Sequence, residues 1–275
     1  MKILFCSLVR SKEKFLVDWH ARIKEIKSLK PDWTLNVSLY ENDSEDNSKE
    51  VLRNLDWSFC DWYKLTSEDL NRKYFTGGER ERIMRLSAYR NICIWQFGDL
   101  DLVDRIIMND VDCGFDPKEA VEIIEESLNW DVYSFASRDT RTGDSFYDRW
   151  ATRLDSGESF WGDHEYDLNG DNPAYTTGNG FTCYNPEPFR CGFTFGYVNH
   201  RGQPYYEHTD PDDPLDVDAQ QRGLKPHDVE NAVVCENFRV LGFGKMAFNG
   251  KYNTMHHRDE IWDKNRPKTK KYDRS

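Results

Sequence analysis

The pattern of apolar and polar positions predicts alternating strands and helices over the first half of the chain. A mostly apolar run at 2–9 is typical of a buried strand, and the helical spacing of apolar residues from Phe15 to Ile26 predicts an amphipathic helix over 12–29. Further elements are expected in this order: a strand at 35–40, a short helix at 48–54, a long helix at 79–97, a strand at 104–108, a helix that begins after Asp116, and a strand at 131–137. This alternation is typical of an α/β fold with a parallel sheet.

The pattern is less regular after residue 140. Residues 174–185 predict a strand pair or a strand and a turn, 229–241 predicts a helix, and 244–257 predicts two short strands. The stretch 196–228 is rich in Pro, Asp, Gly and His, which indicates a long loop or insertion. No repeat or sharp boundary divides the chain, so we expect one domain over 1–260 and a basic polar tail at 261–275.

Composition excludes several classes of protein. The 275 residues are enough for a large core, and the net charge of −12 argues against a nucleic-acid partner, which needs a basic face. The seven cysteines form no CxxC pair, so we expect reduced thiols and a cytoplasmic location. No apolar run approaches the ~20 residues of a membrane span, so no transmembrane segment is predicted.

Two aspartates, Asp110 and Asp112, directly follow the predicted strand at 104–108. Parallel sheets bind ligands beyond the carboxyl ends of their strands, so this pair is expected at the ligand crevice. In an extended segment, side chains two residues apart point the same way, and two carboxylates then suit Mg²⁺ or Mn²⁺. Such an ion can hold the diphosphate of a sugar nucleotide. The alternative is a loop with aspartates at turn positions.

The polar stretch ENDSEDNS, at 41–48, is a second candidate. An EF-hand loop that starts at Asp43 needs Gly at its sixth position and Glu at its twelfth, where Ser48 and Asn54 stand, so calcium binding is excluded. Glu41 or Asp43 could contact the ribose or base of a nucleotide. An Asx-type turn that caps the next helix is an equal alternative.

Basic side chains supply further candidates for ligand binding. The arginines considered for contact with a nucleotide or its phosphates are Arg10, Arg82, Arg85 and Arg90. The last three cannot all share one face of a helix, and a solvated helix face is the alternative. Either His256 or His257, after a predicted strand, could add a nitrogen ligand to the metal, although an isolated histidine is more often structural.

Several motifs together resemble a known family. YENDSEDNS, RLSAYRN, MNDVD and FYDRWATR occur in the order found in the fungal capsule-associated α-1,3-mannosyltransferases, glycosyltransferase family 69, and YTTGNGFTCYNPEPFR is similar to the segment that follows there. The later stretch ENFRVLGFGKMAFNGKYNTMHH is similar to the end of the fungal mannan-polymerase subunits, family 62. The resemblance covers residues 3–195 and 229–258.

The resemblance implies a GT-A fold, a nucleotide-sugar donor with GDP-mannose as first choice, a divalent metal, and retention at the anomeric carbon. It implies that Asp110 and Asp112 lie at the metal and the diphosphate, with His256 or His257 as a further ligand. It also implies that Asp148 and Glu236 lie near the acceptor or the reacting sugar. The chain departs from the family in two ways, because it shows no N-terminal membrane anchor and its residues 196–228 match no family segment.

These observations predict an α/β, GT-A-type single domain, with a mainly parallel central sheet flanked by helices and a loop-rich C-terminal part. The expected function is a metal-dependent hexosyltransferase of polysaccharide biosynthesis, whose partners are a nucleotide sugar and a glycan acceptor. The alternatives are a sugar-phosphate nucleotidyltransferase, or a non-catalytic sugar-binding or inactive transferase-like protein. The basic tail could make a weak peripheral contact with an anionic membrane, with a solvated tail as the alternative.

Overall fold

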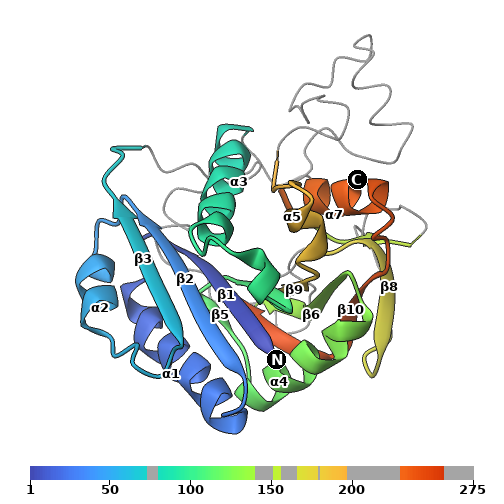
Figure 1. Ribbon diagram of the computed structural model, residues 1–275, viewed down its shortest axis with the longest axis horizontal. Helices are drawn as coiled ribbons and strands as arrows, with labels where there is room; N and C mark the ends of the chain where they lie inside the picture. Colours follow the sequence, from blue (N-terminus) through green and yellow to red (C-terminus); the bar gives the residue numbers. More distant parts are fainter. Residues whose placement is uncertain (73–79, 140–150, 156–165, 179, 197–229, 257–275) are drawn as a thin grey trace, which may run out of the picture.

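A mixed β-sheet with helices on both faces organises the part of the chain that the structure describes (Figure 1). The structure is a computed structural model, and it describes residues 1–72, 80–139, 151–155, 166–178, 180–196 and 230–256. The strands are β1 (Lys2–Val9), β2 (Thr34–Asn42), β3 (Trp62–Glu68), β4 (Arg105–Asn109), β5 (Cys113–Gly114), β6 (Val132–Asp139), β7 (Arg153–Leu154), β8 (Asp171–Thr176), β9 (Phe181–Tyr184) and β10 (Met246–His256). The helices are α1 (Glu13–Leu29), α2 (Ser48–Asn54), α3 (Arg80–Trp95), α4 (Pro117–Glu126), α5 (Glu187–Arg190) and α7 (Glu230–Val240), with short 3₁₀ turns at Leu100–Leu102 and Ser127–Asn129.

The strand order is β3-β2-β1-β4-β9-β6-β10-β8-β7, and β5 pairs with β10. Strands β3, β2, β1 and β4 form a parallel half, and β6 and β10 are also parallel. Strand β9 runs antiparallel to both neighbours, β4 and β6, and joins the two halves. The α/β class with a central sheet flanked by helices is confirmed, and the sheet is mixed because β9, β8, β7 and β5 all pair antiparallel with their neighbours.

Two elements of the second half differ from the expectations, and two other segments fall outside the described residues. Residues 174–185 do form two strands, but β8 and β9 lie in different places in the sheet and do not pair with each other. Residues 246–256 form one strand with an irregularity between Asn249 and Asn253, where two short strands were expected. The predicted insertion at 196–228 falls almost entirely outside the described residues, and the tail at 261–275 falls wholly outside them.

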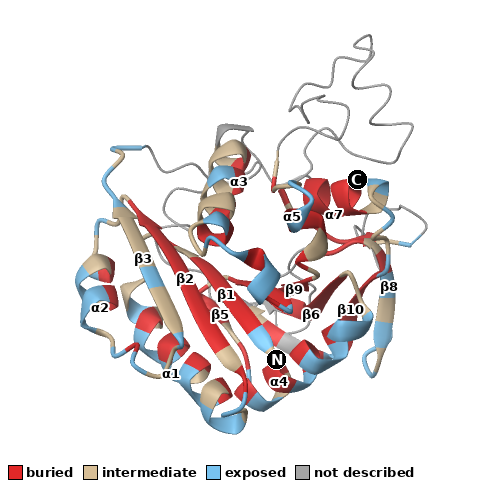
Figure 2. Cartoon of the chain, in the orientation of Figure 1, coloured by how far each residue is buried: buried red, intermediate tan, exposed pale blue. Residues whose placement is uncertain are grey.

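Strand β3 was missed by the pattern analysis. Its sequence, WYKLTSE, contains four polar residues, and its side chains are half-buried or exposed because it is the edge strand of the parallel half. Figure 2 shows the difference, since β1 and β2 are almost wholly buried while β3 is not. Its apolar residues are only Trp62, Tyr63 and Leu65, which pack against the two apolar clusters, and so the strand lacks the longer apolar run or alternation on which the other predictions depended.

The helices cover the two faces of the sheet with separate apolar clusters. On one face α1 and α4 bury residues such as Leu16, Trp19 and Ile123, and on the other face α3 and α7 bury residues such as Cys93 and Phe238. The α4 helix begins as predicted, because the carboxylate of Asp116 accepts hydrogen bonds from two backbone N–H groups in its first turn. The described helices include none that is long and apolar enough to cross a bilayer.

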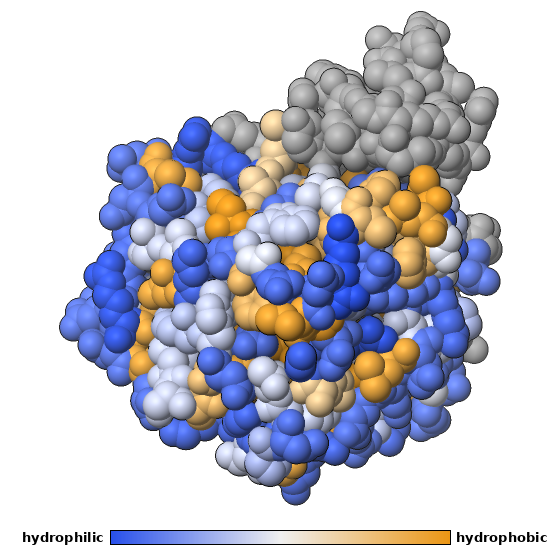
Figure 3. All heavy atoms as spheres, in the orientation of Figure 1, coloured by the Kyte–Doolittle hydropathy of each residue, from blue (hydrophilic) through white to orange (hydrophobic). Residues whose placement is uncertain are grey.

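The outer surface is mostly polar. On the face shown in Figure 3, hydrophilic residues surround small, separate groups of apolar residues. Single large apolar side chains that are exposed on the molecule include Val17, Trp95 and Leu128. Scattered exposed apolar residues of this kind are normal for a folded protein and do not by themselves mark a binding surface.

His20 predicts a pH dependence of stability. Burial lowers the pKa of His20 below 6.5, although the Asp56 carbonyl beside Nε2, at 2.8 Å, acts in the opposite direction. The ring is therefore neutral in the fold and gains a proton more easily after unfolding. Its contribution to stability is complete above pH 6.5 and is lost as the pH falls from there toward its folded pKa.

We expect His20→Gln to flatten the fall in unfolding free energy between pH 7 and 5, relative to the wild type. One extra proton bound by the unfolded chain changes that slope by at most about 1.4 kcal/mol per pH unit. Urea unfolding at several pH values measures the slope for both proteins. Parallel curves would show that the ring is protonated equally in both states.

Candidate active site

The carboxyl ends of β1, β2 and β4 form one edge of the sheet. The three strands are parallel neighbours, with Val9 opposite Glu41 and Cys6 opposite Met108. Polar residues follow each strand at this edge. The chain passes from β1 to Lys12 and from β4 to Asp110. The structure therefore brings the segments after all three strands together at the edge where parallel sheets bind ligands.

Asp110 and Asp112 lie in a tight turn between β4 and β5, so the expectation of an extended segment was wrong. The N–H of Cys113 donates to the carbonyl of Asp110 over 2.9 Å, which closes the turn. The two carboxylates contact different cations, since Asp110 lies 3.7 Å from the guanidinium of Arg90 and Asp112 lies 2.6 Å from the ammonium of Lys12. The segment turns because it must reverse direction to reach β5, which pairs antiparallel with β10.

Asn109, which was not among the site residues expected from the sequence, fixes the start of the turn. Its side-chain oxygen accepts a hydrogen bond from the indole N–H of Trp19 over 2.6 Å, and its amide donates to the carbonyl of Gly180 over 2.7 Å. The N–H of Asp110 donates to the same carbonyl. Asn109 is buried, so these bonds hold the start of the turn against β9 and α1.

Gly180 permits this close approach. A Cβ atom at this position would lie 2.1 Å from the sulfur of Cys113, far inside van der Waals contact. A side chain here would therefore push the turn that carries Asp112 away from β9. The sequence signal for this close approach was the pair of glycines in TTGNGF. From the sequence, that stretch was expected only to form a strand pair or a strand and a turn.

Arg90 is the buried cation of the site. Its guanidinium lies 3.1 Å from a carboxylate oxygen of Glu230, at the start of α7, and 3.7 Å from Asp110. Burial lowers the pKa of Arg90, but the carboxylates of Asp110 and Glu230 outweigh this effect and raise it above its ordinary value. Arg90 thus links α3, α7 and the aspartate turn through one charge. Glu230 was not anticipated from the sequence.

The other arginine candidates occupy different positions. Arg82 and Arg85 lie on α3, about two turns and about one turn before Arg90 respectively, and both are half-buried. Arg10 lies after β1, and its guanidinium donates a hydrogen bond to the carbonyl of Arg72 over 2.6 Å. All three take part in further interactions, so none is a free cation.

Glu41 and Asp43 accept hydrogen bonds from their own loop and from β3 and the segment after it. The buried carboxylate of Glu41 accepts hydrogen bonds from the N–H of Ser44 and the hydroxyl of Ser67. Asp43 has a positive φ of 52° and accepts from the amide of Asn42. Burial opposes ionisation of Asp43, but this bond and backbone N–H groups of residues 70–72 together lower its pKa. Both carboxylates therefore tie the end of β2 to β3 and to the segment that follows it, at the edge where a nucleotide contact was expected.

The ENDSEDNS loop caps two helices. The expected Asx-type turn is present, because the carboxylate of Asp46 accepts from the N–H of Ser48, the first residue of α2, over 3.0 Å, and the loop also caps α1. The hydroxyl of Ser44 accepts from the N–H of Ser11, the hydroxyl of Ser48 accepts from the N–H of Lys12, and the carboxylate of Asp46 accepts from the N–H of Glu13. These N–H groups at the start of α1 have no partner inside the helix. The loop after β2 therefore fixes the backbone from which the Lys12 side chain extends.

The remaining candidates lie nearer the C-terminus. Glu236 is buried on α7, and its Oε1 atom has no hydrogen-bond partner among the described residues. The backbone of His256 pairs with Cys113, directly after Asp112. Asp148 and His257 lie outside the described residues.

The donor set around the turn is compatible with a divalent ion. Where the structure describes side chains, no group of three or more His, Cys, Asp or Glu residues is arranged to hold a metal. Mg²⁺ needs no such group, because it commonly binds through one or two carboxylates together with waters and substrate phosphates. The side chains of Asp110 and Asp112 are 34% and 9% exposed, so the carboxylate of Asp110 is partly open to solvent and that of Asp112 is buried beside it.

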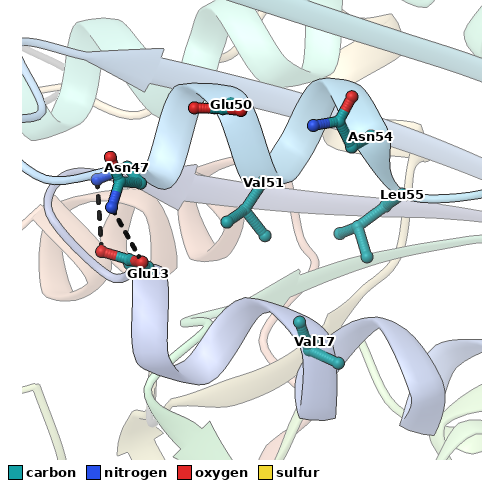
Figure 4. A pocket seen from close by; sticks show the side chains of 7 residues that line it. All are labelled: Glu13, Val17, Asn47, Glu50, Val51, Asn54 and Leu55. Atoms are coloured by element: carbon teal, nitrogen blue, oxygen red, sulfur yellow. Dashed lines mark hydrogen bonds between the residues drawn. The ribbon is translucent and has the colours of Figure 1, made fainter.

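A groove of about 430 Å³ lies elsewhere, between α1 and α2 (Figure 4). It is lined by apolar side chains together with carboxylates and amides: Glu13, Val17, Asn47, Glu50, Val51, Asn54 and Leu55. At one end of the groove, Asn47 donates to the carboxylate of Glu13. None of the lining residues belongs to the aspartate turn, so this groove is separate from the candidate site.

Comparison with known proteins gives one family and one fold. A family model described as Cryptococcal mannosyltransferase 1 matches residues 2–225. Among solved structures, GalNAc-T7 with UDP, GalNAc and Mn²⁺ is 13% identical with a TM-score of 0.55, over 97% of this chain and 45% of that one. S. aureus TarS 1–349 in complex with UDP-GlcNAc is 12% identical with a TM-score of 0.52, over 97% of this chain and 62% of that one.

These structures are GT-A glycosyltransferases, and at this identity they establish the fold alone. The chain spans less than two thirds of the length of either structure. The search of curated proteins gives no match. The expected GT-A fold is therefore confirmed.

Proposed function

Because the chain belongs to the family of Cryptococcal mannosyltransferase 1, whose model matches residues 2–225, we propose that it is a metal-dependent glycosyltransferase. It moves a hexose from a nucleoside-diphosphate sugar to a hydroxyl of a glycan acceptor, within polysaccharide biosynthesis. Mannose, delivered by GDP-mannose, is the first candidate because the family model names a mannosyltransferase. The reaction is retaining in this proposal, as the resemblance to families 69 and 62 implies.

The observation that carries the proposal is the aspartate turn at the carboxyl edge of the parallel strands. Asp110 and Asp112 supply carboxylate oxygens, which Mn²⁺ and Mg²⁺ accept as ligands. When bound, the ion supplies positive charge that stabilises the diphosphate as it leaves the sugar. The backbone pairing of His256 with Cys113 makes His256, with His257 as its alternative, the candidate for a nitrogen ligand.

Other residues of the chain act on the nucleotide and the sugar. Arg10, Arg82 and Arg85 are the proposed phosphate-binding cations, while Glu41 and Asp43 line the nucleoside side of the same edge. In a retaining transfer the leaving phosphate can take the proton of the acceptor hydroxyl, so a strong general base is not required.

Asp148 and Glu236 are proposed to lie near the reacting sugar, as the resemblance implies. The unpartnered Oε1 of buried Glu236 supports this role, because a buried acceptor atom without a donor is costly unless a ligand supplies one. A sugar hydroxyl is such a donor. Asp148 enters the proposal on the resemblance alone.

The cysteines support a reducing, cytoplasmic location. All seven are free thiols, and five of them are buried. Burial raises the pKa of Cys93, Cys183 and Cys235 to about 12, which keeps these thiols protonated and unreactive at neutral pH.

A donor-hydrolysis screen tests the proposed function. GDP-mannose, UDP-glucose, UDP-galactose and UDP-N-acetylglucosamine are incubated with the wild type in Mn²⁺ or in EDTA, and the released nucleoside diphosphate is measured. We expect slow cleavage of one donor with Mn²⁺ and none with EDTA. A nucleotidyltransferase would instead consume a nucleoside triphosphate with a sugar phosphate, and a sugar-binding protein would cleave nothing.

A further inference from the structure

The ammonium of Lys12 contacts the carboxylate of Asp112, which the proposed function assigns to a metal ion. Its nitrogen lies 2.6 Å from Oδ2 of Asp112, and the two side chains are only 17% and 9% exposed. This is a short, charge-assisted contact in a site that is largely shielded from water. The sequence analysis did not single out Lys12, which lies 100 residues from its partner.

The backbone of Lys12 is held in place. Its N–H donates to the hydroxyl of Ser48 over 2.8 Å, and the neighbouring Ser11 and Glu13 are bonded by Ser44 and Asp46 in the same way. Because this backbone is fixed, the mobile part is the four-carbon stem with its ammonium. Because the backbone is fixed and the stem is flexible, the ammonium can move from one anion to another nearby without a change in the fold.

A divalent ion and the ammonium cannot share Oδ2 of Asp112 at ligand distance. The charges are both positive, and their repulsion over a few ångströms is strong in a partly shielded site. When a metal ion takes Oδ2 of Asp112, Lys12 must therefore leave that oxygen. The metal brings the diphosphate of the donor to the same edge of the sheet, and this diphosphate is an alternative anion for a lysine.

We propose that Lys12 is a displaceable counter-cation. It holds the Asp112 carboxylate when no divalent ion is bound, and it moves to the donor diphosphate when the ion takes its place. The inference rests on the proposed function and assigns to that site a residue outside the aspartate pair. Lys12 is thus a donor-binding residue in one state and a competitor of the metal in the other.

Metal binding by the protein without nucleotide tests the first half of the proposal, that Lys12 competes with the metal for Asp112. Mn²⁺ is titrated into the wild type, Lys12→Met and Lys14→Met, and free Mn²⁺ is followed by electron paramagnetic resonance. Lys14 is the matched control, because it is exposed, lies two residues away and rests over the ring of Phe15. We expect Lys12→Met to bind Mn²⁺ about tenfold more tightly, since one competing charge is gone, and Lys14→Met to bind as the wild type does.

Diphosphate binding tests the second half. GDP and UDP are titrated calorimetrically at saturating Mn²⁺, and Lys12→Met is expected to bind the tighter of the two about tenfold more weakly than the wild type. A lysine that only supports the fold would give unchanged or weaker Mn²⁺ binding in Lys12→Met, and either result overturns the inference. Unchanged diphosphate affinity overturns it as well.

Mn²⁺ binding by the wild type distinguishes failure of the proposed function from failure of the inference. If the wild type binds no Mn²⁺, the metal-dependent function and the inference both fail. If it binds Mn²⁺ and Lys12→Met binds no more tightly, only the inference fails. Circular dichroism checks that each variant is folded, and Lys12→Gln serves in the same titrations should Lys12→Met not fold.

Discussion

Replacement of Arg90 by methionine is expected to lower the unfolding free energy by about 3–5 kcal/mol, the usual cost when one partner of a buried ion pair is removed. The Arg90 side chain is 8% exposed and that of Glu230 is 4% exposed, so the remaining carboxylate has no access to bulk water. One of its oxygens, Oε2, already lacks a hydrogen-bond partner. Urea unfolding of the wild type and Arg90→Met measures the loss.

A double variant separates the ion pair from simple loss of packing. We expect Arg90→Met with Glu230→Gln to be more stable than Arg90→Met alone, because the uncompensated charge is gone. The pair Lys30 and Glu125, whose side chains are 31% and 45% exposed, is the surface control. Lys30→Met should cost less than about 1 kcal/mol. An equally small cost for Arg90→Met would contradict the assignment of a buried charge network.

Asp112→Asn is expected to lower metal-dependent donor cleavage by about 10²–10⁴-fold, because the metal contributes several kcal/mol of transition-state stabilisation. The substitution keeps the shape of the side chain and removes its charge. The turn is held by backbone bonds and by Asn109, so the fold should remain. Initial rates of nucleoside diphosphate release at saturating Mn²⁺ measure the effect.

Asp104→Asn is the matched control for this experiment. Asp104 directly precedes β4, at the opposite edge of the sheet, where its carboxylate accepts a hydrogen bond from the N–H of Lys2. The same change of charge at that edge should leave donor cleavage within about twofold of the wild type. If Asp112→Asn retains full activity while the wild type is metal-dependent, Asp112 is not a ligand of the metal.

The elements that were predicted best are those whose structure depends on their own residues. Strand β1, helix α1 and the Asp116 cap follow from local apolar spacing and local hydrogen bonds, and the structure has them within one or two residues of the predicted bounds. Strand β3 is stabilised by its pairing with β2 at the edge of the sheet. Strand β9 is only four residues long, and its place between β4 and β6 depends on partners far along the chain.

The candidate site divides in the same way. The position of Asp110 and Asp112 after a buried strand was visible from the sequence, because topology places strand ends at one edge. Their partners were not visible, since Lys12 and Arg90 come from other elements and reach them only in the fold. The prediction of an extended segment failed because the antiparallel partner of β5, which requires the turn, lies more than a hundred residues later.

The place of β9 in the sheet has a consequence for the order in which the protein folds. Strands β4 and β6 are synthesised first, but each lacks a neighbour on its inner side until Phe181–Tyr184 has left the ribosome. Until then, one edge of β4 and both edges of β6 are open to pairing with other chains, since β10, the other neighbour of β6, is synthesised later still. A nascent chain that stops before β9 is therefore the form of this protein most exposed to aggregation, and the stage at which a chaperone has most to protect.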